Sequence, residues 1–140
     1  MKTAIIYKSF FGTTKKYAKW LNEKMDSDIF TFKQFSEKKF NDYQRFIILS
    51  GTYFGWMPLT KYLMKNWRYL KDKNVVVLAV GYVPAKDPWS RKSYEQIPVR
   101  IQEKIHYYKV HGKMLFEPKE LVKKENLKPV EKLLKNKKCL

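Results

Sequence analysis

Cysteine is almost absent from this chain of 140 residues, whose single cysteine is Cys139. One cysteine cannot form a disulfide within the chain, and its next-to-last position does not match a prenylation signal. The chain is therefore predicted to work in a reducing, cytoplasmic setting.

Long apolar runs, internal repeats and Gly/Ser-rich linkers are missing too. No run approaches the roughly 20 apolar residues of a membrane-spanning helix, and the N-terminal apolar segment of about five residues is too short for a signal peptide. Apolar residues nevertheless make up 44% of the chain, which is enough for a hydrophobic core. The sequence predicts one folded domain over residues 1–140.

Acidic residues are scarce, because 13 Asp and Glu stand against 30 Lys and Arg, for a formal net charge of +17. Such a balance favours acidic partners, whether an acidic protein, nucleic acid or an anionic membrane. Lysines occur along nearly every segment, so a generally basic surface without a specific partner is the simpler interpretation. No segment shows an RNA-recognition motif, and nucleic acid is not expected as a partner.

The lysine-rich C-terminal segment allows two interpretations. It contains Lys132, Lys135, Lys137 and Lys138. These side chains fit the solvated face of a helix, or a peripheral contact with anionic lipid at about 1 kcal/mol per basic residue.

Short apolar runs alternate with amphipathic stretches, which predicts alternating strands and helices. Strands are expected at residues 2–7, 28–32, 45–49, 74–80 and 107–116, the last with a bulge or kink at Gly112. Helices are expected at 13–25, 58–70, 98–105 and 121–134, with a helical turn within 36–44 and a loop over 81–93. This order predicts an α/β fold, a doubly wound parallel sheet of five strands with helices on both faces.

In such a sheet, ligands bind beyond the carboxyl ends of the strands. The first loop at this edge runs from Ser9 to Thr14 and joins a buried strand directly to a helix. Backbone amides, hydroxyl groups and the positive end of the helix dipole converge there, so the loop is predicted to bind phosphate. It lacks both the Gly-Lys-Ser/Thr ending of a nucleoside-triphosphate loop and the three-glycine dinucleotide motif.

Two further loops at this edge are rich in aromatic residues and glycine. One follows the third strand, from Ser50 to Met57, and the other follows the fourth strand, from Gly81 towards Trp89. A flat ring can stack on Tyr53, Trp56 or Tyr82 while the glycines let backbone amides approach its edge. A phosphate loop beside an aromatic slot predicts a site for flavin mononucleotide (FMN).

These residues resemble the flavodoxin-domain family. Ser9, Gly12 and Thr14 match the family's Ser/Thr-x-x-Gly-x-Thr phosphate loop, and Thr52-Tyr53-Phe54-Gly55 resembles the ring-binding segment of flavodoxin-like reductases. The resemblance implies the strand order 2-1-3-4-5, bound FMN, and a glycine carbonyl that reorients on reduction, for which Gly51 and Gly55 are the candidates.

The opening segment YKSFFGTTKKYAKWL also resembles the branch that contains the quinone-dependent protoporphyrinogen oxidases. That branch carries a long insertion between its last strand and last helix, and residues 116–121 leave no room for one. This departure argues against porphyrinogen oxidation.

The predicted cofactor-binding residues lie in these three loops and form a phosphate-binding group and a ring-binding group, and no catalytic residue is predicted. They are Ser9, Phe10, Phe11, Gly12, Thr13 and Thr14 for the phosphate, and Gly51, Thr52, Tyr53, Phe54, Gly55, Trp56, Gly81, Tyr82 and Val83 for the ring. The predicted function is electron transfer or a small oxidoreductase activity, with a redox partner protein or a quinone-type molecule as partner. The alternative is a cofactor-free module that binds an acidic partner, because Phe10 and Phe11 could fill the flavin site instead of covering the flavin.

Each signal also has a purely structural interpretation. The first loop could be an ordinary turn with Thr13 as the helix N-cap. At least one of the residues Tyr53, Phe54, Trp56 and Met57 is expected to pack in the core. His106 and His111 lie in the predicted last strand without cysteines or carboxylates at metal-ligand spacing, so structural roles and no metal are expected.

Overall fold

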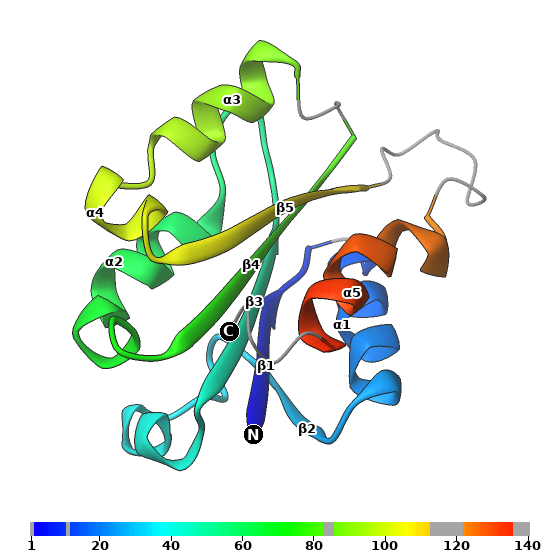
Figure 1. Cartoon of the computed structure of the whole chain (residues 1–140). Helices are drawn as coiled ribbons and strands as arrows, with labels where there is room; N and C mark the ends of the chain where they lie inside the picture. The colour runs from blue at the N-terminus through cyan, green and yellow to red at the C-terminus, as the bar shows by residue number, and fades with distance from the viewer. Residues whose placement is uncertain (1, 11, 83–85, 113–121, 136–140) are drawn as a thin grey trace.

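The computed structural model describes residues 2–10, 12–82, 86–112 and 122–135. Five parallel strands form one sheet in the order β2-β1-β3-β4-β5, which confirms the predicted topology (Figure 1). The strands are β1 (Thr3–Lys8), β2 (Ser27–Thr31), β3 (Arg45–Gly51), β4 (Asn74–Gly81) and β5 (Ile105–His111). The helices are α1 (Thr13–Lys24), α2 (Pro58–Leu70), α3 (Pro88–Glu95), α4 (Val99–Gln102) and α5 (Lys128–Lys135), with short 3-10 turns η1 (Glu37–Asp42) and η3 (Lys124–Leu127).

The strands are continuously apolar because helices cover both faces of the sheet. Successive side chains of β4 point to opposite faces, so Val75 and Val77 belong to one core cluster, while Val76 and Leu78 belong to the other. The first face is covered by α2, α3, α4 and η1, and the second by α1, α5 and η3 (Figure 1). Register is fixed because a shift by one residue would exchange the two sets of side chains.

The second face is closed by segments far apart in the sequence. The Tyr17 hydroxyl donates to the His111 carbonyl oxygen at 2.5 Å, and the Asn126 side-chain amide donates to the Tyr17 hydroxyl oxygen at 2.8 Å. Leu127 and Val130 are buried in the same cluster. One tyrosine of α1 thus links the end of β5 to η3.

The region between β4 and β5 differs from the prediction. The expected loop over 81–93 contains the first turns of α3, because Pro88 occupies the first helical position and the Asp87 carboxylate accepts the Trp89 amide hydrogen at 2.9 Å. The expected helix over 98–105 is also wrong in extent, since only Val99–Gln102 is helical and Ile105 already pairs with Val75 in the sheet.

The last helix is shorter than expected, and the bounds of the last strand also differ from the prediction. β5 ends at His111, directly before Gly112, and residues 113–116 of the predicted strand lie outside the described residues. Leu121 lies outside them too, and the final α-helix begins only at Lys128, after η3. Among the residues that the structure describes, no helix is long and apolar enough to cross a membrane.

Candidate functional site

The first candidate loop, between β1 and α1, is a tight turn built on Gly12. Its φ of +88° lies in the left-handed region, and an added Cβ would meet no atom within 4 Å, so the backbone conformation and not the space requires glycine. The Gly12 amide donates to the Ser9 hydroxyl oxygen at 2.9 Å. Gly12 itself is the N-cap residue of α1, so the structural alternative with Thr13 as N-cap is wrong.

This turn concentrates hydrogen-bond donors at one place. The first turn of a helix leaves backbone amides without intrahelical partners, and the first turn of α1 has no acidic residue to compensate them. Thr13 is half-buried at the turn, Thr14 is buried, and Ser9 keeps its hydroxyl proton available because it accepts from Gly12. The donor set suits a phosphate group. Phe11, also predicted here, lies outside the described residues.

The second candidate loop, after β3, is a two-residue hairpin turn. Tyr53 and Trp56 exchange two backbone hydrogen bonds, of 2.6 and 3.1 Å, and the residues between them both have positive φ, +50° at Phe54 and +85° at Gly55. This combination is that of a type I′ turn, in which glycine is favoured and a bulky side chain is rare. The turn projects Phe54 into solvent, with 80% of the side chain exposed. Met57 is fully buried, which confirms that at least one residue of this loop packs in the core.

The first two loops meet through their aromatic rings. The rings of Phe10 and Tyr53 are 5.2 Å apart between centroids, and Tyr53 lies 5.9 Å from Trp56. The hydroxyl end of Tyr53 covers Gly51 so closely that a Cβ at that position would overlap it. Burial raises the pKa of Tyr53. Much of the Tyr53 ring is therefore covered by protein, whereas Trp56 is 48% exposed.

The third candidate loop begins at Gly81, where β4 ends. The Thr52 amide donates to the Val80 carbonyl oxygen at 2.9 Å, and the Thr52 hydroxyl occupies the space that a Cβ of Gly81 would need. Tyr82 is exposed, and its ring lies 6.1 Å from that of His111, whose Nε2 is buried without a hydrogen-bond partner. The second and third loops are thus packed directly against each other. Val83 lies outside the described residues.

Trp89 reaches this edge from a helix and not from a loop. It lies in the first turn of α3, and its ring meets Phe54 edge-to-face at 6.3 Å. A Cβ on Gly55 would lie 3.0 Å from Cε3 of Trp89, so glycine is needed there for space as well as for φ. The sequence Asp87-Pro88, a capping residue before a proline, is the signal that identifies this helix start.

Together these segments form an exposed aromatic edge on a basic surface. The edge consists of Phe10, Phe54, Trp56, Tyr82 and Trp89. Ammonium groups lie over two of the rings, with Lys8 at 5.5 Å from the centroid of Phe10 and Lys92 at 5.5 Å from that of Trp89. The described residues contain no cluster of His, Cys, Asp or Glu that could hold a metal ion. Two surface pockets stand out, and neither is lined by the predicted site residues.

The sheet order and the position of these loops can be compared with those of solved structures. Solved structures with the same fold include a flavodoxin from the domain Archaea, with a TM-score of 0.64, 15% identity, and coverage of 95% of this chain and 93% of that chain. Another is the flavodoxin of Streptococcus pneumoniae TIGR4, with a TM-score of 0.62, 16% identity, and coverage of 96% of both chains. A third is a Lactobacillus acidophilus flavoprotein solved in complex with FMN, with a TM-score of 0.57, 17% identity, and coverage of 79% and 92%.

The family model described as "Flavodoxin domain" matches residues 4–139, so the chain belongs to the flavodoxin-domain family. No curated protein sequence matches it.

Proposed function

We propose that this protein binds FMN at the carboxyl edge of its sheet and transfers electrons through it. The observation that carries the proposal is the turn at Gly12, which presents the Ser9 hydroxyl and the N-terminus of α1 at the same edge as the aromatic loops. The similarity to a flavoprotein that was solved with FMN supports the choice of cofactor. FMN supplies the redox chemistry when it is bound, and the chain orients it and controls its surroundings.

The first loop provides the phosphate site of the proposal. Its residues are Ser9, Phe10, Phe11, Gly12, Thr13 and Thr14. Backbone amides of the first turn and the hydroxyl groups donate hydrogen bonds, and the dipole of α1 favours the negative charge. Lys15 and Lys16 directly follow the loop, are exposed, and add positive potential.

The second and third loops provide the ring site. Its residues are Gly51 to Trp56 and Gly81 to Val83. The Tyr53 ring packs against Phe10, and its hydroxyl end lies against Gly51. We therefore assign the stacking faces to Trp56 and Tyr82, which are 48% and 42% exposed. Gly55 is the better candidate for a peptide that changes orientation, since its φ is already positive and Gly51 is held in β3.

The exposed aromatic edge suggests how electrons enter or leave. Phe54 and Trp89 are exposed beside the ring site, and Lys92 and Lys86 are exposed near them. A redox partner protein with an acidic surface, or a quinone-type molecule that stacks on aromatic rings, suits this composition. A peripheral contact with anionic lipid through Lys132 and Lys135 of α5, both exposed, belongs to the same proposal. Cytoplasmic location and oxidoreductase turnover stay predictions.

A cofactor-free module is the second candidate, and one observation favours it. Phe10 packs against Tyr53 and thereby fills space between the first two loops. In that case the basic surface alone would recruit an acidic partner.

Visible absorption spectroscopy and FMN titration separate the two candidates. The expected result is a flavin spectrum shifted from that of free FMN, in the purified protein or after adding FMN. Ser9→Ala should weaken FMN binding about tenfold or more, because a hydrogen bond to a charged group contributes about 1.5–3 kcal/mol. Val99→Ala, an exposed change on α4, is the matched control and should bind normally. Absence of any spectral change on titration would reject the FMN proposal and favour the cofactor-free module.

A further inference from the structure

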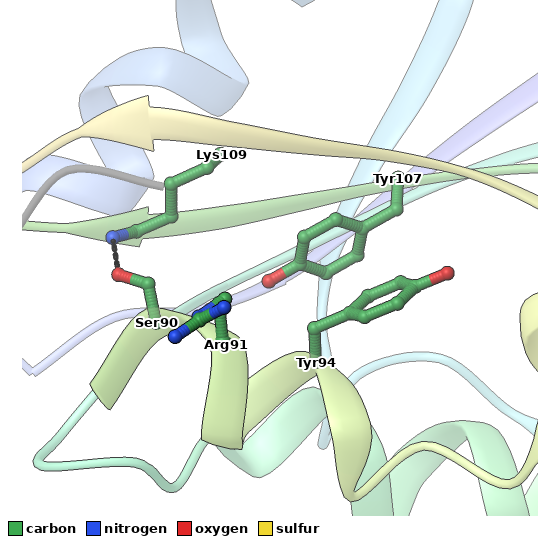
Figure 2. A pocket seen from close by; sticks show the side chains of 5 residues that line it. All are labelled: Ser90, Arg91, Tyr94, Tyr107 and Lys109. Atoms are coloured by element: carbon green, nitrogen blue, oxygen red, sulfur yellow. Dashed lines mark hydrogen bonds between the residues drawn. The ribbon is translucent and has the colours of Figure 1, made fainter. Parts of the chain in front are cut away.

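A second polar site lies away from the aromatic edge, between β5 and α3. It is a pocket of about 120 Å³ lined by Ser90, Arg91, Tyr94, Tyr107 and Lys109 (Figure 2). None of these residues belongs to the predicted cofactor site, and no lining residue is acidic. Three of them come from α3 and two from β5, so the pocket exists only because the helix lies across the last strand.

Lys109 supplies a fixed positive charge. Its Nζ donates to the Ser90 hydroxyl oxygen at 2.8 Å (Figure 2). Burial lowers the pKa of Lys109, and the carboxylate of Asp87 acts in the opposite direction. The wall of the pocket therefore carries a half-buried ammonium group, which attracts an anion.

Tyr107 carries the strongest indication of a ligand. Its hydroxyl group is buried and has no hydrogen-bond partner in the structure. Leaving such a group unsatisfied destabilises the folded chain unless a ligand or water accepts its hydrogen bond. Burial, together with the proximity of Tyr94, raises the pKa of Tyr107, so the hydroxyl stays protonated and can donate. The Tyr94 ring lies 4.7 Å from that of Tyr107 and holds it in place.

Arg91 adds a second cation at the mouth of the pocket. Figure 2 shows the Tyr107 hydroxyl on the side of Ser90 and Arg91, whereas the Tyr94 hydroxyl points away from them. Arg91 is exposed on α3, so its guanidinium group can reach a ligand in the opening. The result is two cations and two hydroxyl groups around one small space.

We propose that this pocket binds a small phosphate-type oxyanion. Its volume of about 120 Å³ leaves room for a tetrahedral anion between the lining side chains. The hydroxyl of Tyr107 and the ammonium group of Lys109 bind the buried oxygens, and Arg91 binds the oxygens at the opening. Free phosphate and a phosphate group carried by a larger molecule share this chemistry. The site goes beyond the proposed function, because it uses none of the residues assigned to FMN.

The test is a titration of the full chain with sodium phosphate, in which ¹H–¹⁵N NMR spectra monitor binding. Sodium chloride keeps the ionic strength constant. We expect saturable shifts of the Ser90, Arg91 and Lys109 amide signals. Tyr107→Phe should weaken this binding about fivefold, as expected for the loss of one hydrogen bond of about 1 kcal/mol. Arg91→Gln should weaken it about tenfold or more, since it removes a charge-assisted contact.

Two controls make the result specific. Arg100→Gln removes an exposed arginine of α4 that does not line the pocket, and it should leave the affinity unchanged. Ser9→Ala perturbs only the proposed FMN phosphate loop and should also leave these shifts unchanged, so the two proposals can fail separately. Equal shifts in chloride alone would overturn the proposal. So would phosphate affinities of Tyr107→Phe and Arg91→Gln that equal that of the unchanged chain. Binding of both phosphate and O-phosphoserine would identify carried phosphate groups as ligands, and binding of phosphate alone would identify the free anion.

Discussion

Gly81 and Thr52 provide a sharp test of how the second and third loops fit together. A Cβ at Gly81 would overlap the Thr52 Oγ1 and lie 3.0 Å from Cε and Nζ of Lys109. Inserting a carbon into such a contact costs about 1–3 kcal/mol. The φ of Gly81 is not positive, so alanine also restricts the unfolded chain and returns about 0.4–1 kcal/mol. Gly81→Ala is therefore expected to destabilise the protein by about 1–2 kcal/mol.

Thr52→Ala should largely cancel this cost. It removes the Oγ1 that the new Cβ would meet, and the remaining contacts at 3.0 Å with Cε and Nζ of Lys109 require only a small shift. In the Thr52→Ala background, Gly81→Ala should be neutral within about 0.5 kcal/mol. Urea denaturation of the four proteins gives the coupling energy, expected at about 1 kcal/mol or more. Thermal unfolding should show the same effect as about 3 °C per kcal/mol.

Gly12→Ala is the matched control for this cycle. A Cβ at Gly12 meets nothing within 4 Å, so its cost of about 1–2 kcal/mol comes from the positive φ alone. That cost should be the same with and without Thr52→Ala. If Gly81→Ala costs equal amounts in both backgrounds, the two loops are not in contact as described, and the reasoning is refuted.

Two predictions concern the core. Burial, and then the hydrogen bond to Asp28 at 2.6 Å, raises the pKa of Tyr43 to about 12 from 10.0, so its stabilising effect is complete below pH 10 and is lost as the pH rises through about 12. Tyr43→Phe should lose less stability over this pH range, and equal losses in urea denaturation would contradict the assignment. Phe40 is 2% exposed and packs against Phe35 and Tyr69, with centroids 4.9 Å away in each case. Phe40→Ala should lower the free energy of unfolding by about 3–5 kcal/mol, and a loss below about 1 kcal/mol would mean that the aromatic cluster is not tightly packed.

Local chemistry made most of the fold predictable from the sequence. The apolar run from Asn74 to Val80 predicts a central strand, and Pro58 predicts the start of α2, which the structure confirms. The prolines and polar residues over 81–93 predict a loop and not the start of α3, although Asp87 before Pro88 is itself a helix-start signal. The strand β5 begins at Ile105 and not at Tyr107, because pairing with β4 extends it beyond what its own pattern suggests.

The candidate site could be predicted only in part, because contacts between separate loops depend on backbone conformation and helix placement. The sequence indicates which residues follow each strand, and all described members of the three loops do lie at or near the carboxyl ends of β1, β3 and β4. Ring contacts between loops, such as that of Phe10 with Tyr53, depend on backbone conformations like the φ of +50° at Phe54. The pocket formed by Tyr107 and Lys109 with α3 requires knowledge of how the helix crosses the last strand. No spacing in the sequence brings these residues together.

The link between Tyr17, His111 and Asn126 bears on how the chain folds while it is being synthesised. A ribosome releases α1 and the first four strands before η3 and α5 exist, so the apolar residues under α5 remain open to water until α5 has been synthesised. During that interval the growing polypeptide presents a sheet face that can associate with other chains or be held by a chaperone. The arrival of Asn126 at the Tyr17 hydroxyl, with Leu127 and Val130 behind it, ends this exposed period.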